Sequence, residues 1–248
     1  MRISVITVCY NASTTIEETL DSIKAQDFPD VEHIVVDGLS TDETPEVLNK
    51  RSEQIAKIIS ERDDGIYDAM NKGIAHASGE IVGFLNADDV YADSRVLSLI
   101  ADAFETHKSD SIYGDLQYVS ADNPGKVVRN WKELSYKRSR FKQGWMPPHP
   151  TFYVKKELLD KFGAFNTAFK ISADYELMLR LLYKYKASTV HIPHILVKMK
   201  VGGKSNQSIK NRIIANKEDR KAWKINGLRM LPYTTVFKPL RKINQFWT

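Results

Sequence analysis

Two adjacent carboxylates, Asp88 and Asp89, stand just past the carboxyl end of a short apolar run, Ile81–Leu85, that is typical of a buried strand. In open α/β sheets, ligands bind in the crevice beyond the carboxyl ends of the strands. Hard carboxylate oxygens there suit Mg²⁺ or Mn²⁺, which share their coordination with substrate phosphates. A solvated Asp–Asp turn is the simpler interpretation, and the neighbouring segments decide between the two.

The elements that would position these carboxylates follow one another regularly. Short β-branched runs alternate with segments whose apolar residues recur at helical spacing, as Ile16, Leu20 and Ile23 do. This alternation predicts parallel strands joined by right-handed crossovers, and therefore an α/β fold with a doubly wound, mostly parallel sheet and helices on both faces. The strands are expected at 3–10, 33–37, 55–60 and 81–85.

Polar residues stand at three of these predicted strand ends. Tyr10 and Asn11 follow the first strand, Asp37 ends the second, and Asp88 and Asp89 follow the fourth. Because the carboxyl ends of parallel strands share one edge of the sheet, a nucleotide lying across that edge would meet all three.

The second half of the chain is less regular. A turn at 122–125 separates two strand-forming runs and predicts a β-hairpin. Gly163 is expected to end a helix. The expected strands are 111–119, 126–131, 151–154, 188–192 and 196–201, and the expected helices are 155–162 and 175–185.

Charge is distributed unevenly along the 248 residues, whose net charge is +5. Residues 200–248 hold 12 Lys or Arg and 2 Asp or Glu, a net charge of +10. Residues 1–199 hold 24 Lys or Arg and 29 Asp or Glu, a net charge of −5. A basic tail on an acidic body indicates a polyanion or an anionic membrane as partner. The single cysteine, Cys9, cannot form an internal disulfide, which favours a reducing, cytoplasmic compartment.

Within the tail, Val236, Leu240, Ile243 and Trp247 fall on one stripe of a predicted helix. Basic amphipathic helices lie in the membrane interface, and no apolar run approaches the ~20 residues that span a bilayer. We therefore expect residues 206–248 to attach the protein peripherally to an anionic membrane. The stripe could instead pack on the protein itself or on a second copy in a homo-oligomer. Nucleic acid is disfavoured as a partner, because no nucleic-acid motif accompanies the charge.

Motifs of several other enzyme classes are missing. The sequence contains neither GxGxxG nor HExxH. Residues 203–205, Gly-Lys-Ser, look like the end of a P-loop, but Lys198 stands where that motif needs its first glycine.

Six short motifs carry a resemblance to a known family. They are SVITVCYN at 4–11, VVDGLSTD at 35–42, DGIYDAMNKG at 64–73, FLNADD at 84–89, HPTF at 149–152 and SADYE at 172–176. Together they resemble family 2 glycosyltransferases, which have the Rossmann-like GT-A fold. The third motif is similar to members that build bacterial exopolysaccharide, such as colanic acid glycosyltransferases.

The resemblance covers about residues 1–205 and departs from the family pattern at two positions. Asn86 stands where the metal motif usually opens with Asp, and Ala173 stands where Glu often precedes Asp174. The first departure leaves a metal held mainly by Asp88 and the phosphates. The second leaves Asp174 as the base candidate of its motif.

The resemblance implies a nucleoside-diphosphate sugar as donor and Mn²⁺ or Mg²⁺ as cofactor, with Asp88 and Asp89 as the metal ligands. It implies Asp174 as the base that takes the acceptor proton, since an inverting displacement needs one base. The residues implied to bind the nucleotide sugar are Thr7, Cys9, Tyr10, Asn11, Asp37, Asp64, Lys72, Asn86, Ala87, Asp88 and His149.

These assignments have simpler structural alternatives. Asp37 and Asp174 could each do no more than open a helix. Lys72 could be a solvated helix residue, and His149 could be a structural histidine. Trp145 could form an apolar platform for a sugar or belong to the core.

The sequence thus predicts an inverting, metal-dependent glycosyltransferase that extends a lipid-linked saccharide at the inner face of a bacterial membrane, in surface polysaccharide synthesis. We expect residues 1–110 to bind the nucleotide sugar, 111–205 to bind the acceptor, and 206–248 to form the tail. A catalytically silent nucleotide-sugar or glycan-binding protein is an alternative, which Asn86 keeps open. A sugar-1-phosphate nucleotidyltransferase would need a Gly-rich, Arg-containing first loop, which residues 8–12 lack.

Overall fold

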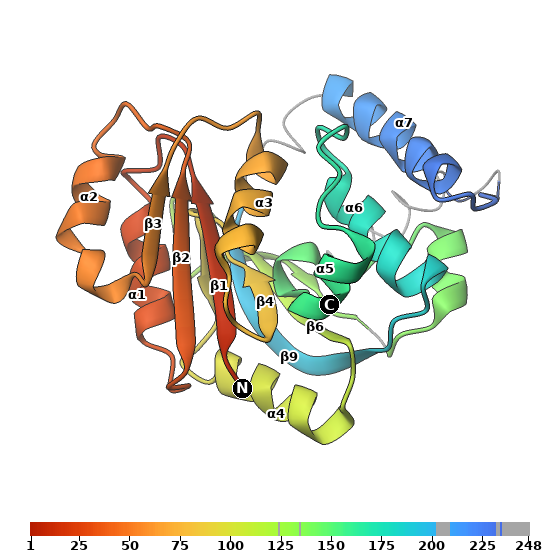
Figure 1. The fold of residues 1–248 in the computed structure, drawn as a ribbon, viewed down its shortest axis with the longest axis horizontal. Helices are drawn as coiled ribbons and strands as arrows, with labels where there is room; N and C mark the ends of the chain where they lie inside the picture. The colour runs from red at the N-terminus through yellow and green to blue at the C-terminus, as the bar shows by residue number, and fades with distance from the viewer. Residues whose placement is uncertain (124, 134, 202–208, 232–233, 235–248) are drawn as a thin grey trace.

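A computed structural model describes residues 1–123, 125–133, 135–201, 209–231 and 234 (Figure 1). The strands are β1 Ile3–Cys9, β2 Val31–Asp37, β3 Lys57–Ser60, β4 Ile81–Phe84, β5 Asp89–Tyr91, β6 Ser111–Val119, β7 Val127–Trp131, β8 Tyr153–Lys155 and β9 Thr189–Lys200. These described strands form one sheet in the order β3-β2-β1-β4-β8-β6-β9-β5, with β7 paired to β6.

The first half of the chain forms the parallel part of the sheet. β1 is parallel to β2 and to β4, and β2 is parallel to β3. Helices connect these strands, as the alternating pattern predicts. They are α1 Ile16–Lys24, α2 Thr44–Lys50 and α3 Ile66–His76, with the short 3₁₀ turn η1 Ser52–Gln54 before β3. A fourth helix, α4 Val96–His107, connects β5 to β6.

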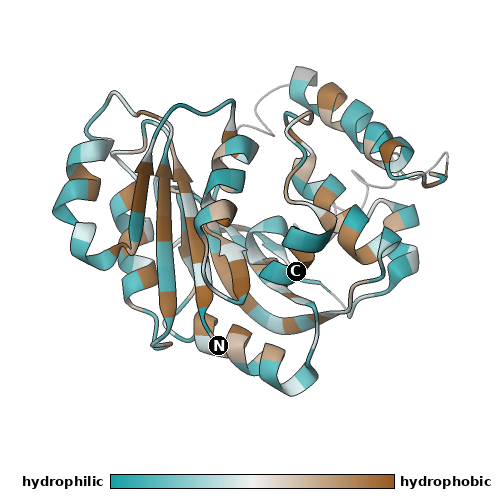
Figure 2. Ribbon diagram, in the orientation of Figure 1, coloured by the Kyte–Doolittle hydropathy of each residue, from teal (hydrophilic) through white to brown (hydrophobic). Residues whose placement is uncertain are grey.

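Helices cover both faces of this parallel part. Ile6 and Val8 of β1 pack in the core that contains the buried side of α3, whereas Ile3 and Val5 pack with α4 on the other face. Successive strand residues point to opposite faces, so one apolar strand contributes to both cores. The hydropathy colouring in Figure 2 shows that the parallel strands are largely apolar. Gly73 lets α3 lie close to the sheet, since a Cβ there would be 2.4 Å from Cγ2 of Ile6. The predicted doubly wound α/β fold is confirmed.

Beyond β4 the sheet becomes mixed. β8 is antiparallel to β4 and to β6, and β5 is antiparallel to β9, whereas β6 and β9 are parallel. β6 and β7 form the predicted hairpin. The sheet therefore continues from the nucleotide half predicted at 1–110 into the acceptor half predicted at 111–205.

β9 is one strand where the sequence predicts two. Gly114 of β6 pairs with Ile192, and the next residue, Asp115, pairs with Ile195, so two residues beginning at Pro193 bulge out of the ladder. Proline has no N–H to give to a ladder and is tolerated in a strand at such a bulge. The bulge interrupts the apolar pattern without ending the strand.

The predicted helices of the second half are present. α5, Lys156–Phe162, ends at Gly163, whose φ of +91° favours glycine. α6, Ala173–Met178, continues into a π-helical segment, η4 Leu179–Lys184. Two 3₁₀ turns, η2 Arg138–Gln143 and η3 His149–Thr151, lie between the hairpin and β8.

α7, Ile209–Ile225, packs on α6 (Figure 1). Trp223 is buried in the same core as α3 and α6, and its Nε1 donates a hydrogen bond to Oη of Tyr175 at 2.8 Å. The first part of the predicted tail therefore belongs to the folded body. The predicted stripe at 236–247 lies outside the described residues, and the predicted boundary at 205 stays a prediction. Among the described helices, none is long and apolar enough to cross a membrane.

Candidate active site

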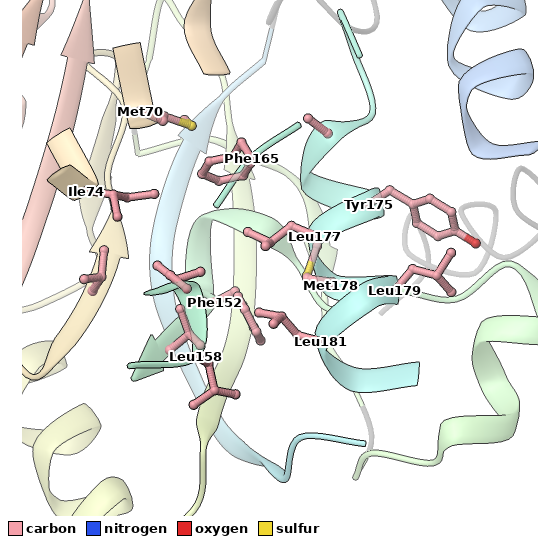
Figure 3. Packing of buried hydrophobic residues seen from close by; sticks show 14 of the residues in the cluster. Met70, Ile74, Phe152, Leu158, Phe165, Tyr175, Leu177, Met178, Leu179 and Leu181 are labelled. Carbon is pink, nitrogen blue, oxygen red and sulfur yellow. The ribbon is translucent and has the colours of Figure 1, made fainter. Parts of the chain in front are cut away.

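A pocket lies beside the carboxyl end of β4, between α3, η3 and α6. Its polar lining consists of Tyr67, Asn86, His149 and Asp174. Figure 3 shows much of its apolar lining, which consists of Ile66, Met70, Phe84, Pro150, Phe152, Val154, Phe165, Leu177 and Met178. Trp145 is 3% exposed and packs in the core, so in this structure it is a core residue and not an exposed platform for a sugar.

Asp174 stands in the first turn of α6 with a partly exposed carboxylate, which two side chains hold. Its Oδ1 accepts a hydrogen bond from Oη of Tyr67 at 3.4 Å, and its Oδ2 lies 3.3 Å from Nδ1 of His149. Ser172 occupies the N-cap position, but its hydroxyl donates to the carbonyl of Ala215 instead of capping α6. The structure thus brings together Asp174 and His149, which are far apart in the sequence.

The predicted metal motif forms the turn between β4 and β5. Asp88 is half-buried, and burial raises its pKa, which the charge of Lys200 partly counteracts. Asp89 is fully buried, and burial together with the charge of Asp88 raises its pKa well above the ordinary value. A metal cation beside Asp88 and Asp89 would add to the charge of Lys200 and would offset the cost of burying two carboxylates.

Two oxygens of this turn lack hydrogen-bond partners in the described part of the chain. They are Oδ1 of Asn86 and Oδ1 of Asp89, and both are buried. Together with Asp88 they form a set of hard oxygens, which fits Mg²⁺ or Mn²⁺. No group of three or more His, Cys, Asp or Glu among the described residues could hold a metal. An ion here would therefore take further ligands from substrate phosphates or water.

Asn11 joins the loops that follow β1 and β2. Its Oδ1 accepts a hydrogen bond from the backbone N–H of Thr41 at 2.8 Å, and its own N–H donates to Oγ of Ser40 at 2.8 Å. Tyr10, the preceding residue, is 58% exposed. The two loops form one polar surface with an exposed aromatic ring, at the edge of the sheet where the sequence predicts the nucleotide.

Asp37 is buried at the end of β2 and shapes the loop that follows. Its carboxylate accepts hydrogen bonds from the N–H of Ser40 at 3.2 Å and from Oγ of Ser60 at 2.9 Å. It does not open a helix, because α2 begins at Thr44 with Glu43 at its N-cap position.

Thr7 and Cys9 do not face solvent, so we revise their predicted contact with the nucleotide. Thr7 is fully buried, and its Oγ1 lies 3.0 Å from Nε2 of His33, whose pKa burial lowers to about 4. Cys9 is buried with its Sγ 3.8 Å from Oδ1 of Asp37, and burial raises the pKa of the thiol. Thr7 therefore joins β1 to β2 within the sheet, and Cys9 contacts the carboxylate that holds the loop after β2.

Asp64 lies two residues before α3, and Lys72 lies within α3. Nζ of Lys72 lies 3.0 Å from Oε1 of Glu61 and 3.4 Å from Oδ2 of Asp68. Its ammonium therefore ties α3 to the loop after β3, which differs from the predicted direct contact with the donor. Asp64 is exposed, and its backbone N–H donates to Oδ2 of Asp68 at 3.1 Å.

Sequence reasoning missed two residues of the site. A Cβ added to Gly38 would lie 2.4 Å from Oδ2 of Asp63. The carboxylate of Asp63 therefore packs closely against the loop after β2. Asp63 directly precedes Asp64 in the sequence, and these two adjacent carboxylates could have indicated Asp63 as a candidate. Tyr67, which contacts Asp174, lies inside the DGIYDAMNKG motif, but nothing local shows which distant residue a tyrosine will meet.

Comparison with known proteins decides the family. The model described as Glycosyl transferase family 2 matches residues 4–163, more than half of the chain. The chain belongs to glycosyl transferase family 2. The match includes the β4–β5 turn and α3, and it ends just before the segment that leads to Asp174.

Relatives of this family 2 glycosyltransferase occur in mycobacteria. An uncharacterised glycosyltransferase of Mycobacterium tuberculosis is 33% identical over 180 residues, which cover 72% of this chain and 68% of the relative. A PGL/p-HBAD biosynthesis glycosyltransferase of Mycobacterium bovis is 29% identical over 209 residues, which cover 82% of this chain and 78% of the relative.

Solved structures of similar fold confirm the GT-A architecture of this glycosyltransferase. S. aureus TarS 1–349 in complex with UDP-GlcNAc has a TM-score of 0.71 at 20% identity, covering 99% of this chain and 72% of TarS 1–349. In another crystal structure of S. aureus TarS 1–349, this chain spans 64% of the length of the TarS chain. A mannosyltransferase of Pyrobaculum calidifontis in complex with GDP-Man and Mn²⁺ has a TM-score of 0.67 at 22% identity. The match covers 97% of this chain and 69% of the mannosyltransferase.

Proposed function

We propose that this glycosyltransferase moves a sugar from a nucleoside-diphosphate sugar to a saccharide acceptor, with inversion at the anomeric carbon. The observation that carries the proposal is one pocket containing both Asp174 and Asn86 of the predicted metal motif. A base and a diphosphate site must lie close together for a single in-line displacement. UDP-GlcNAc and GDP-Man in the similar folds support this class of donor.

Asp174 would take the proton from the acceptor hydroxyl as that oxygen attacks the anomeric carbon. Contacts with Tyr67 and His149 hold both of its oxygens, so the carboxylate is oriented before the acceptor arrives. Among the described residues that line the pocket, Asp174 is the one carboxylate. This favours direct displacement over hydrolysis, which needs two carboxylates flanking the bond.

Asp88 and Asn86 would hold Mn²⁺ or Mg²⁺, which as a Lewis acid offsets the charge that grows on the leaving diphosphate. Asp88 is half-buried, whereas Asp89 is fully buried. We therefore assign Asp88 as the main ligand on the substrate side of the ion and the buried, unpartnered Oδ1 of Asp89 as a further ligand from within the turn. The mannosyltransferase with Mn²⁺ supports a divalent ion in this fold.

Tyr10 and Asn11 would border the base and ribose of the donor, with Asp37 holding the loop beneath them. The exposed ring of Tyr10 offers an aromatic face to a nucleobase. The hydrogen bonds of Asn11 and Asp37 keep the two loops in one arrangement, so little ordering is needed when the donor binds.

We expect nucleoside diphosphates and their sugars to stabilise the protein in the presence of Mn²⁺. A ligand at ~100 times its dissociation constant adds about 2.7 kcal/mol to the free energy of unfolding. A thermal-shift panel of UDP, GDP and their sugars, with and without Mn²⁺, measures this effect. Nucleosides without phosphates are the control, because they cannot share a metal with Asp88.

Donor hydrolysis in the same samples separates an enzyme from a silent binder. Stabilisation without any hydrolysis or transfer would favour the nucleotide-sugar-binding alternative. If no nucleotide sugar shifts the unfolding temperature at millimolar concentration, the donor site is wrongly assigned.

We further propose that the acceptor is a lipid-linked saccharide for a bacterial surface polysaccharide, at the inner, anionic face of the membrane. Helix α7 supports this, because its acidic residues Glu218 and Asp219 are buried, whereas those of its basic residues whose side chains are described face solvent. The exposed basic residues of α7 are Arg212, Lys217, Arg220, Lys221 and Lys224. Lys238, Arg241 and Lys242, which the sequence places beside the predicted apolar stripe at 236–247, would add further positive charge.

We expect the protein to float with anionic liposomes at low salt and to remain unbound with neutral ones. Each Lys or Arg near an anionic surface contributes roughly 1 kcal/mol, so replacing Lys238, Arg241 and Lys242 by Gln should weaken binding about 100-fold. Replacing Lys24, Lys50 and Lys108, which are exposed elsewhere, removes the same charge and is the control. Equal loss of liposome binding in both variants would show that net charge, and not the tail, drives the binding. Absence of flotation of the wild type would exclude attachment to the membrane.

A further inference from the structure

The segment that joins α5 to α6, residues 163–172, forms neither a helix nor a strand. It carries Phe165, which lines the pocket, and it leads directly to Asp174. Because its backbone has no ladder of its own, its position depends on the side chains that bind it. Those side chains come from helical segments on three sides: α3, α6 with η4, and α7.

α3 binds both ends of this segment through Tyr67 and Asn71, which lie one turn apart on one face. Nδ2 of Asn71 donates to the carbonyl of Phe165 at 2.9 Å, and its Oδ1 accepts from the N–H of Phe165 at 2.9 Å. Oη of Tyr67 donates to the carbonyl of Ile171 at 2.7 Å and contacts Asp174. Burial raises the pKa of the phenol, so it stays a donor at neutral pH.

α7 binds the same segment through one buried carboxylate. Glu218 is 9% exposed and accepts hydrogen bonds from the N–H groups of Lys170, Ile171 and Ser172, at 2.8, 2.9 and 2.8 Å. Bonds from N–H groups to an ionised carboxylate are stronger than neutral ones. Three such bonds fix the backbone directly before Asp174.

The start of the segment is held by Arg180 of η4. Its guanidinium donates to the carbonyls of Gly163 and Ala164, both at 2.6 Å, and its Nε pairs with Oε1 of Glu176 at 2.9 Å. Both residues of this ion pair are largely buried. The segment is therefore bound along its length and not at one point.

We propose that Tyr67, Asn71 and Glu218 are positioning residues, which fix segment 163–172 so that Asp174 faces the acceptor hydroxyl. The proposal rests on the role of Asp174 as base. α3 is suited to this task because its first residues follow Asp63, whose carboxylate lies against the loop after β2. α3 thus reaches from the loops assigned to the donor to segment 163–172, which leads to Asp174.

The test is Tyr67→Phe, which keeps the ring and its stacking on Phe165 but removes the O–H that binds Ile171 and Asp174. A misplacement of about 1 Å can cost ~10²-fold in rate, so we expect kcat to fall roughly 10- to 100-fold. The dissociation constant of the donor should change by less than about twofold, because the loss is confined to the transition state.

Tyr136→Phe is the matched control. Oη of Tyr136 donates to the carbonyl of Leu182 at 3.0 Å, so this variant loses the same kind of bond without a link to Asp174. It should keep a near-normal kcat even if it loses as much stability as Tyr67→Phe. Equal kcat values in the two variants, beside an active wild type, would overturn the positioning role alone. A wild type that transfers no sugar from any donor would overturn the proposed function and this role with it.

Glu218→Gln gives a second, independent test from α7. An amide offers one acceptor oxygen instead of two, so the segment loses at least one of its three bonds. We expect kcat to fall about 10-fold, with faster hydrogen exchange at the amides of Lys170, Ile171 and Ser172. Faster exchange with unchanged kcat would show that the bonds stabilise the segment without positioning Asp174.

Discussion

Asp174→Asn should lower kcat by roughly 10²–10⁴-fold, the range for loss of a general base. The amide is nearly isosteric with the carboxylate but cannot take the acceptor proton. Steady-state kinetics with a saturating donor measures the effect. Calorimetry with the nucleoside diphosphate should give an unchanged dissociation constant, because Asp174 is assigned to the acceptor side of the pocket.

Asp160→Asn is the control for this result. Asp160 lies on the surface of α5, paired with Lys156 at 2.9 Å, and exposed pairs of this kind contribute little. The variant should therefore retain normal turnover. If Asp174→Asn also turns over at a near-normal rate, the base must be another residue, and His149, 3.3 Å away, becomes the first candidate.

Asp88→Ala should abolish measurable transfer and uncouple nucleotide binding from Mn²⁺. A metal ion contributes several kcal/mol of transition-state stabilisation, and each 1.36 kcal/mol is tenfold in rate, so we expect a loss of at least about 10³-fold. The fold should survive, because Asp88 is only half-buried in the β4–β5 turn. Nucleotide affinity measured with Mn²⁺ and with a chelator gives the decisive comparison.

Asp102→Ala is the control for the metal assignment, since Asp102 is exposed on α4. It should keep the full difference in nucleotide affinity between Mn²⁺ and chelator. Were Asp88→Ala to keep that difference as well, the ion would be held elsewhere. An enzyme that is fully active in a chelator would remove the metal from the mechanism.

The buried positions of Thr7 and Cys9 show one limit of motif reasoning. Both lie in a motif that resembles the family pattern, yet Thr7 is fully buried on β1 and Cys9 is 7% exposed. β1 is buried on both faces, so its sequence lacks the polar alternation that would tell a ligand-facing position from a core position. The residues that face solvent come after the strand, at Tyr10 and Asn11.

The sequence by itself determined the order of strands and helices in the first half and the edge of the sheet at which the candidate residues gather. Apolar periodicity fixes these features because it reports which face of a local element is buried. The parallel arrangement then brings the ends of β1, β2 and β4 together. Asp37, Asp88 and Asn11 are found at that edge for this reason.

Only the tertiary structure decided what surrounds Asp174, the residue proposed as the base. Asn71 meets Phe165, Tyr67 meets Ile171 and Asp174, and Glu218 meets Ser172. Each contact joins a side chain to a segment far away in the sequence, mostly through backbone groups that every residue carries. Such contacts leave no periodicity or composition in either segment, so no local pattern predicts them. They form only when the fold has placed α3, α6 and α7 around the same segment, residues 163–172.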